Sequence, residues 1–292
     1  PSQSLRKAYG EAAYENMQKR WNVVIHEWCA SVIRRHYLLD ESSRAQWMAG
    51  DRSARSRWNV LTPLLRASSS AKDPSAPDHW LERHRQLARL HLPQLGAQLH
   101  LLDVGSCGNY FMEHHSDAFH VTALDLAPAK PSVLRCDFLQ LEVLPQGSDA
   151  SISGSLTGVR NLHGLPQGKF DVIVMALFLS YVPNAALRGE MVAKARRLLR
   201  EDAGGLLIVA DTLTSIGRYG SQSFEAQRGR GSWVDAIEAM GFKLIGCPGA
   251  HFTAHRDKKH GTFNRATGFT FMTVPIRSDA DTQSLVPAPA PV

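Results

Sequence analysis

The chain has 292 residues, of which 43% are hydrophobic, and a formal net charge of +6. This length and apolar content suffice for one large or two ordinary domains with a buried core, which excludes a disordered or fibrous protein. No run of eighteen apolar residues occurs and the first residues lack the apolar core of a secretory signal, so we expect an intracellular protein without a membrane span. The four cysteines show no Cys-x-x-Cys spacing, which speaks against a zinc site or a disulfide framework.

The N-terminal third is basic and has a helical pattern. Residues 1–90 hold 15 Lys and Arg against 9 Asp and Glu, whereas the remainder is balanced at 18 of each. This excess marks either a face for a polyanion or solvated helix surface. Apolar residues recur at helical spacing through residues 5–65, and we interpret one stripe as packing residues, namely Trp21, Val24, Ile25 and Trp28. We place a linker at the Ser-, Ala- and Pro-rich segment 67–77, so that residues 1–92 form a helical, basic N-terminal domain.

From residue 99 onward, short apolar runs alternate with helical stretches. Four runs have the continuous apolar character of buried strands, at residues 100–104, 121–125, 170–175 and 206–210. Such strands with helices between them predict a parallel sheet covered on both faces, and hence a doubly wound, Rossmann-like α/β domain over residues 93–277. Further segments are expected as two strands (241–245 and 268–274), an insertion loop (146–168) and a disordered tail (278–292).

The ends of the first three strands carry residues typical of nucleoside binding. Gly105 follows the first strand, where a glycine lets the backbone turn tightly and a ligand approach closely. Asp125 ends the second strand, where a carboxylate accepts hydrogen bonds from both ribose hydroxyls. Asp137 and Phe138 follow the next strand, where an acid suits the exocyclic amine of adenine and an aromatic ring suits its face.

The turn after the first strand favours a ligand without phosphates. A dinucleotide normally needs three glycines there, because its pyrophosphate sits against a helix N-terminus. Cys107 and Asn109 occupy the second and third places. The ordered series of glycine and acids is instead that of the Rossmann-like S-adenosylmethionine (SAM) methyltransferases. His114 and His115 follow the turn without a carboxylate at ligand spacing, so we expect surface residues and no metal site.

Five motifs together resemble one family: Gly105-Ser106-Cys107-x-Asn109-x-Phe111, Cys136-Asp137-Phe138-Leu139, Leu179-Ser180-Tyr181-Val182-Pro183, Arg188-Gly189-Glu190-Met191 and Gly241-Phe242. This family contains the fungal large-subunit ribosomal RNA adenine-N1 methyltransferase and the animal SAM sensor SAMTOR, which acts upstream of the mTOR complex. The resemblance covers residues 99–245. It implies SAM as the cofactor, with S-adenosylhomocysteine (SAH) as product. It also implies cofactor-binding residues at the strand ends, for which we name Asp103, Gly105, Ser106, Cys107, Asn109, Asp125, Leu126, Asp137 and Phe138.

The candidate catalytic residues follow the fourth strand. N1 of adenine already carries an in-plane lone pair, so methyl transfer requires alignment rather than a base. The product is cationic, and an aromatic face would stabilise its charge. Tyr181 is therefore the first candidate, with Ser180 beside it, although Tyr181 is equally suited to a packing role. Arg218 and Tyr219, after the fifth strand, are expected to contact substrate.

The sequence leaves two main functions. The basic N-terminal third favours RNA, so we expect methylation of adenine N1 in large-subunit ribosomal RNA, with ribosomal RNA or the pre-ribosome as partner, in the nucleus or nucleolus. The rival is a cytoplasmic SAM sensor, in which SAM shifts the two domains between open and closed states and so regulates a signalling protein complex. A small-molecule methyltransferase is a third alternative that conflicts with the basic N-terminal region.

Overall fold

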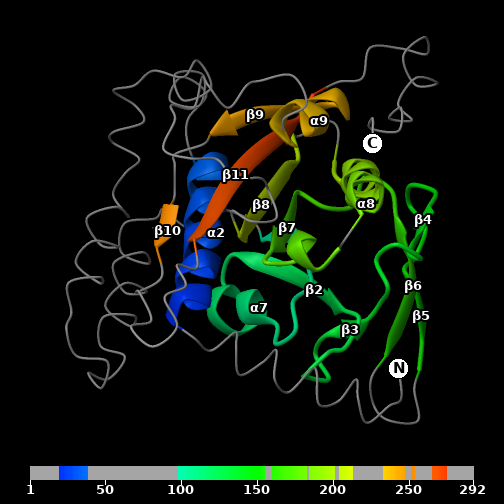
Figure 1. Ribbon diagram of the computed structural model, residues 1–292. Coiled ribbons are helices and arrows are strands. Elements are labelled where there is room, and N and C mark those ends of the chain that lie inside the picture. The colour runs from blue at the N-terminus through cyan, green and yellow to red at the C-terminus, as the bar shows by residue number, and fades with distance from the viewer. Residues whose placement is uncertain are drawn as a thin grey trace.

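The structure is a computed structural model, and it describes residues 20–38, 98–154, 160–182, 184–200, 204–212, 233–246, 251–253 and 265–274 (Figure 1). The predicted linker at 67–77, the tail at 278–292 and the boundary of the N-terminal domain lie outside these residues. Arg218 and Tyr219 lie outside them as well. The division into two domains therefore stays a prediction.

The described strands form one sheet that follows a doubly wound path. The order is β10-β11-β8-β7-β1-β2-β3-β6-β4, with β5 paired to β6 and β9 to β11. The strands are β1 (Leu99–Val104), β2 (Phe119–Asp125), β3 (Leu134–Arg135), β4 (Glu142–Leu144), β5 (Ser151–Ser153), β6 (Asn161–Pro166), β7 (Val172–Ala176), β8 (Leu206–Thr212), β9 (Phe242–Gly246), β10 (His251–Thr253) and β11 (Arg265–Thr273).

The central strands run parallel and the last long strand is reversed. β1 pairs in parallel with β2 and β7, β7 with β8, and β2 with β3, whereas β11 is antiparallel to both β8 and β9. The chain runs outward from β1 through β2 to β3 and then returns to β7 on the other side of β1. In such sheets a ligand binds where the strand order reverses, beyond the carboxyl ends of the strands. The predicted Rossmann-like α/β architecture is confirmed.

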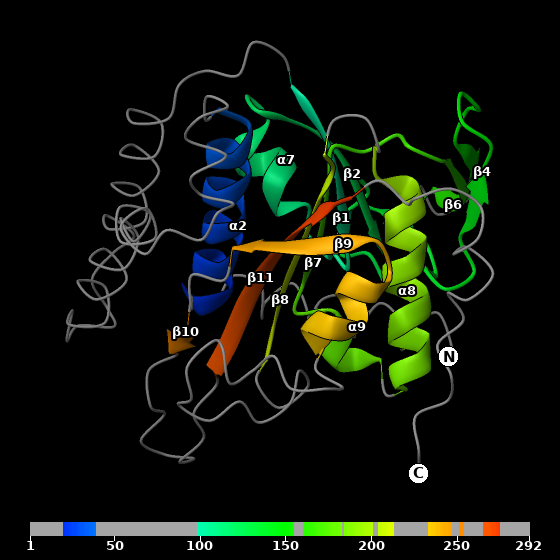
Figure 2. The same ribbon diagram turned by 90° about the horizontal axis from the view of Figure 1, so that it is seen from above.

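Helices cover both faces of the sheet, as Figure 2 shows. The helices α2 (Arg20–Leu38) and α7 (Tyr110–His115) lie on one face, and α8 (Ala185–Leu198) and α9 (Trp233–Ala239) lie on the other, while the short helix η1 (Leu179–Tyr181) follows β7. In β7, Val172 and Val174 pack toward α2 whereas Ile173 and Met175 pack toward α8. Successive side chains of a strand point to opposite faces, so a strand covered on both sides must be apolar throughout. This explains the continuous apolar runs in the sequence.

The helix α2 packs directly on the sheet. Ile25, Trp28 and Ile33 are at most 4% exposed and share a cluster with residues of β1, β7 and β8. The indole of Trp28 lies over Gly268 of β11, where an added Cβ would meet it at 2.4 Å. The predicted packing role is confirmed for Ile25 and Trp28. The side chains of Trp21 and Val24 lie outside the described residues.

The prediction of an insertion loop over residues 146–168 is wrong in part, because β5 and β6 lie within it. β6 pairs with β3, β4 and β5 and so extends the sheet beyond β3. Leu162 and Leu165 anchor β6, since both are buried in the core on the α8 side. Gly164 looks like a loop residue in the sequence, but a Cβ there would meet the Leu144 side chain at 3.0 Å. The glycine allows β4 to approach β6 closely.

Candidate functional site

The turn after β1 has an unusual backbone conformation. Gly105, Cys107 and Asn109 all have positive φ angles, of 80°, 51° and 61°. A side chain at Gly105 would also meet the Phe178 ring at 2.6 Å, so the glycine is required for two reasons. Positive φ costs energy at Cys107 and Asn109, and strain of this kind gathers at functional sites. The turn places the backbone of residues 105–109 at the carboxyl end of the central strand.

Asp125, the predicted ribose acid, faces this turn. Its Oδ2 accepts a hydrogen bond from the backbone N–H of Cys107 at 3.1 Å, and its Oδ1 accepts one from Ala127 at 2.7 Å. Burial raises the pKa of this carboxyl, while the two backbone hydrogen bonds lower it. Each carboxylate oxygen has a second lone pair, so both can also accept from a ligand hydroxyl. Leu126, which follows Asp125, is 59% exposed and presents an apolar surface beside the acid.

Two buried acceptor atoms beside the turn have no hydrogen-bond donor in the described part of the chain. They are Oδ2 of Asp103, at the end of β1, and Oδ1 of Asn109. The Asn109 amide nitrogen donates to the carbonyl of Ser132 at 3.2 Å, which fixes its orientation, and its backbone N–H donates to Ser106 Oγ at 3.1 Å. Burial raises the pKa of Asp103 to about 7, against a Ser106 hydrogen bond that lowers it. Unpaired acceptors and carboxylates suit a ligand that brings donors or positive charge, and they oppose a pyrophosphate.

The third predicted acid lies on the segment after β3. Asp137 is exposed, and its Oδ1 accepts the backbone N–H of Leu139 at 3.0 Å. Phe138 is only 2% exposed and belongs to the hydrophobic core. The backbone N–H of Cys136 donates to the Asp125 carbonyl at 2.9 Å. This hydrogen bond fixes the backbone next to Asp137 against that of Asp125, at adjacent strand ends.

The candidate catalytic residues lie on η1, beyond the end of β7. Tyr181 is 67% exposed, which leaves its ring available for contact. Ser180 precedes it in the same turn, and its side chain lies outside what the structure describes. An Arg188 guanidinium nitrogen donates to the Val182 carbonyl at 2.6 Å and so fastens the end of η1 to α8. The candidate site thus has the residues predicted to bind the cofactor at the ends of β1, β2 and β3, and an exposed aromatic side chain after β7.

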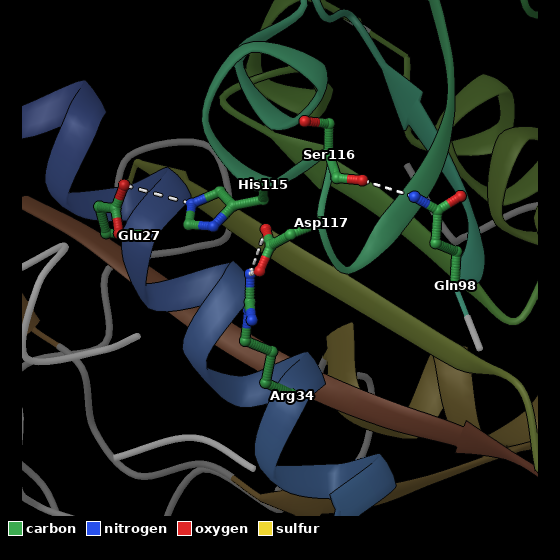
Figure 3. A network of polar contacts seen from close by, with 6 residues as sticks. All are labelled: Glu27, Arg34, Gln98, His115, Ser116 and Asp117. Atoms are coloured by element: carbon green, nitrogen blue, oxygen red, sulfur yellow. Dashed lines mark hydrogen bonds and ion pairs between the residues drawn. The ribbon is translucent and has the colours of Figure 1, made fainter. Parts of the chain in front are cut away.

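A polar network ties α2 to the helix that begins at the turn (Figure 3). Glu27 accepts a hydrogen bond from the Tyr110 hydroxyl at 2.7 Å and lies 3.2 Å from His115 Nε2. Arg34 donates to both oxygens of Asp117, at 2.8 and 2.9 Å. The prediction that His115 is a surface residue is wrong: it is 6% exposed, because α2 covers α7.

No cluster of three or more His, Cys, Asp or Glu suited to a metal ion occurs among the residues that the structure describes. Within those same residues, no helix combines the length and the hydropathy needed to cross a lipid bilayer.

Comparison with known proteins agrees with the sequence motifs. Residues 160–213 match the model of a family described as 25S rRNA (adenine(2142)-N(1))-methyltransferase, Bmt2. Over 224 residues the chain is 34% identical to a Danio rerio protein named "S-adenosylmethionine sensor upstream of mTORC1", covering 74% of this chain and 50% of that protein. A Xenopus laevis protein of the same name is 28% identical over 225 residues, covering 75% and 50%.

The family resemblance predicted from the motifs is confirmed. The strand order is that of the Rossmann-like α/β fold which the resemblance predicts. The chain spans about half the length of the curated relatives that it matches. Among solved structures, it is similar to the N-methyltransferase NodS from Bradyrhizobium japonicum WM9 in complex with SAH, with a TM-score of 0.40 and 18% identity over 72% of this chain and 96% of that one. The [4+2]-cyclase SpnF has a TM-score of 0.42 and 13% identity over 75% and 94%.

Sequence reasoning did not identify the residues that contact the segments of the site from neighbouring elements. Lys194 and Arg188 of α8 bind backbone carbonyls of the two segments that flank the site. Phe178 packs on the glycine turn. Lys194 and Phe178 lie in no motif, and Arg188 belongs to a motif of the family resemblance that says nothing of this contact. A basic side chain on an amphipathic helix has the same sequence pattern whether it is solvated or bound to a carbonyl.

Proposed function

We propose that the chain binds SAM at the carboxyl ends of β1, β2 and β3. The observation that carries this proposal is the set of acceptors around the turn, where Asp125 faces Cys107 and where the buried oxygens of Asp103 and Asn109 lack donors among the described residues. SAM brings two ribose hydroxyls and a positively charged amino-acid end, which are the partners that such acceptors need. When bound, SAM supplies an electrophilic methyl group on sulfur, while these residues hold and orient the ligand.

Calorimetric titration with SAM tests this proposal. Asp125→Asn replaces one acceptor oxygen with an amide group, so we expect at least a tenfold loss of affinity, which corresponds to about 1.4 kcal/mol. Asp149→Asn serves as a matched control, because Asp149 is exposed and lies on the segment before β5. Unchanged SAM affinity in Asp125→Asn, or tighter binding of a dinucleotide than of SAM by the unmodified protein, would contradict the proposal.

The favoured role for this binding is SAM sensing. Relatives named as SAM sensors match about three quarters of the chain, at up to 34% identity. The geometry supports the same role, because α7 begins directly after the turn and its Tyr110 and His115 contact Glu27 of α2. A change at the turn can therefore reach α2 through one short helix. The partner would be a signalling protein complex in the cytoplasm.

Methyl transfer to adenine N1 of large-subunit ribosomal RNA, in the nucleus or nucleolus, is the second candidate. The match of residues 160–213 to a ribosomal RNA methyltransferase family favours it, and so does the exposed ring of Tyr181 beyond β7. The argument from positive charge is weaker than the sequence suggested. Arg34 is 7% exposed and bound to Asp117, so it does not offer its charge to a phosphate.

Two measurements separate the candidates. Incubation of the protein with labelled SAM and unmodified large-subunit ribosomal RNA gives labelled RNA if the chain is the methyltransferase, and none if it is the sensor. Hydrogen exchange of residues 20–38 with and without SAM reports on the sensor, which requires protection of α2 to change on binding. Labelled RNA together with unchanged exchange of α2 would refute the sensing role.

A further inference from the structure

The helix α8 reaches the segment that follows β3 through one lysine. The ammonium of Lys194 donates hydrogen bonds to the carbonyl oxygens of Phe138 at 2.9 Å and Leu139 at 2.6 Å. The same nitrogen lies 5.8 Å from the centre of the Phe138 ring. Two carbonyls and one aromatic face thus surround a single positive charge that comes from more than fifty positions away in the chain.

This lysine completes a frame around Asp137. The start of the segment is fixed by the hydrogen bond from Cys136 N–H to the Asp125 carbonyl, at 2.9 Å. Its middle is fixed by the turn in which Asp137 Oδ1 accepts from Leu139, at 3.0 Å. Asp137 Oδ2 accepts no hydrogen bond from the part of the chain that the structure describes, and this exposed oxygen remains for a ligand. Lys194 fixes the far end of the segment.

The Lys194 ammonium makes these contacts in place of hydrogen bonds to water. Lys194 is half-buried, and burial lowers its pKa from the ordinary lysine value, while the nearby acidic groups, among them Asp137 and Glu190, raise it. A lysine that only served solubility would extend into water and avoid the cost of desolvation. Here the ammonium instead donates hydrogen bonds to backbone carbonyls of one segment, and such charge-assisted hydrogen bonds are stronger than neutral ones.

We propose that Lys194 is a positioning residue for adenine recognition: its ammonium holds residues 137–139 so that the free Asp137 oxygen meets the exocyclic amine of the base. This inference rests on the proposed binding of SAM and deepens it. Lys194 does not contact the ligand in this scheme. It acts through Asp137, so its loss weakens discrimination between bases and leaves the rest of the site intact.

The base itself provides the readout. Hypoxanthine carries a carbonyl where adenine carries its exocyclic amine, and a carbonyl oxygen facing the Asp137 carboxylate is repelled. The probes are SAH and its deaminated form, S-inosylhomocysteine, which differ at this position and at the adjacent N1, where adenine has a lone pair and hypoxanthine has a hydrogen. Their affinity ratio for the unmodified protein measures how well the carboxylate is placed. A merely structural role for Lys194 would leave this ratio unchanged.

The test variant is Lys194→Met, which keeps the apolar stem and removes the charge. Lys169→Met is the control. The Lys169 ammonium also lies over a phenylalanine ring, 5.9 Å from the centre of Phe170. Lys169 comes just before β7, at the amino ends of the parallel strands, whereas the glycine turn lies at their carboxyl ends. Calorimetry with both probes should show SAH affinity about tenfold lower in Lys194→Met, as expected for one lost charge-assisted hydrogen bond. Affinity for S-inosylhomocysteine should change less than about twofold, and Lys194→Arg should recover part of the ratio.

Each other outcome rejects the inference. An unchanged affinity ratio in Lys194→Met, or an equal loss for both probes, means that Lys194 does not place the carboxylate. An equal drop in the ratio for Lys169→Met means that the effect is not local. If the unmodified protein binds neither probe, the proposed function fails and this inference falls with it. Thermal unfolding of each variant shows whether an equal loss arises from unfolding.

Discussion

The buried carboxyl of Asp103 makes the stability of the folded chain depend on pH. Asp103 is 2% exposed at the end of β1, and burial raises its pKa from 3.8 to about 7. Between these values the folded chain keeps the proton and the unfolded chain releases it. Because the folded state binds more protons in this window, the free energy of unfolding falls as the pH rises through it.

The magnitude follows from the size of the shift. One pKa unit corresponds to about 1.36 kcal/mol, so the whole window corresponds to about 4 kcal/mol, of which about 2–3 kcal/mol falls between pH 5 and pH 8. Asp103→Asn has no carboxyl at this position and lacks this dependence. We expect the stability of the variant relative to the unmodified protein to rise by about 2–3 kcal/mol from pH 5 to pH 8. Any constant cost of the amide group cancels in this difference.

Urea unfolding at pH 5, 6, 7 and 8 without SAM, followed by tryptophan fluorescence, measures this difference. The buried indole of Trp28 reports on the fold, since it is 4% exposed when α2 is packed. Asp149→Asn changes an exposed carboxyl and should give a curve parallel to that of the unmodified protein at every pH. Parallel curves for Asp103→Asn as well would refute the reasoning, because they would mean that Asp103 ionises normally in the folded chain.

Two further substitutions test the packing of α2. Gly268→Ala places a methyl group 2.4 Å from the Trp28 ring, so it should lower the free energy of unfolding by about 1–3 kcal/mol. In the control Gly154→Ala, the added methyl group meets nothing within 4 Å and should change the free energy of unfolding little. Equal effects of the two substitutions in thermal unfolding would contradict this view of the interface. Tyr37→Phe removes the 2.8 Å hydrogen bond from the tyrosine hydroxyl to the Asp171 carbonyl and should cost about 1 kcal/mol in urea unfolding, a prediction that fails if the variant is as stable as the unmodified protein.

The parts of the fold that the sequence predicted are those that short-range patterns specify. The four central strands are where the apolar runs placed them, because a strand buried on both faces is apolar at most of its positions. Gly105 and Asp125 were found because a turn and a strand end are properties of a few consecutive residues. Their proximity then follows from the parallel pairing of β1 with β2.

Contacts between distant parts of the chain were not predictable in this way. The helical stripe of α2 indicated that one face is buried, but a stripe does not say which surface it meets. The pairing of Arg34 with Asp117 crosses 83 positions, and neither residue lies in a motif. For β6, the strand propensity of Leu162 and Leu165 was outweighed in the sequence by nearby Gly and Ser, and only the packing of Gly164 against Leu144 explains the glycine.

The packing of Trp28 on Gly268 has a consequence for how the chain folds during its synthesis. The two residues are separated by most of the chain, and β11 lies between β8 and β9 within the sheet. At about 5–20 residues per second, a ribosome needs roughly 12 to 50 s to make the intervening stretch. Throughout that interval the apolar side of α2 lacks its final neighbour and is open to chaperones or to wrong association. A messenger RNA truncated before the codons of β11 should therefore yield a chain that aggregates rather than a smaller folded protein.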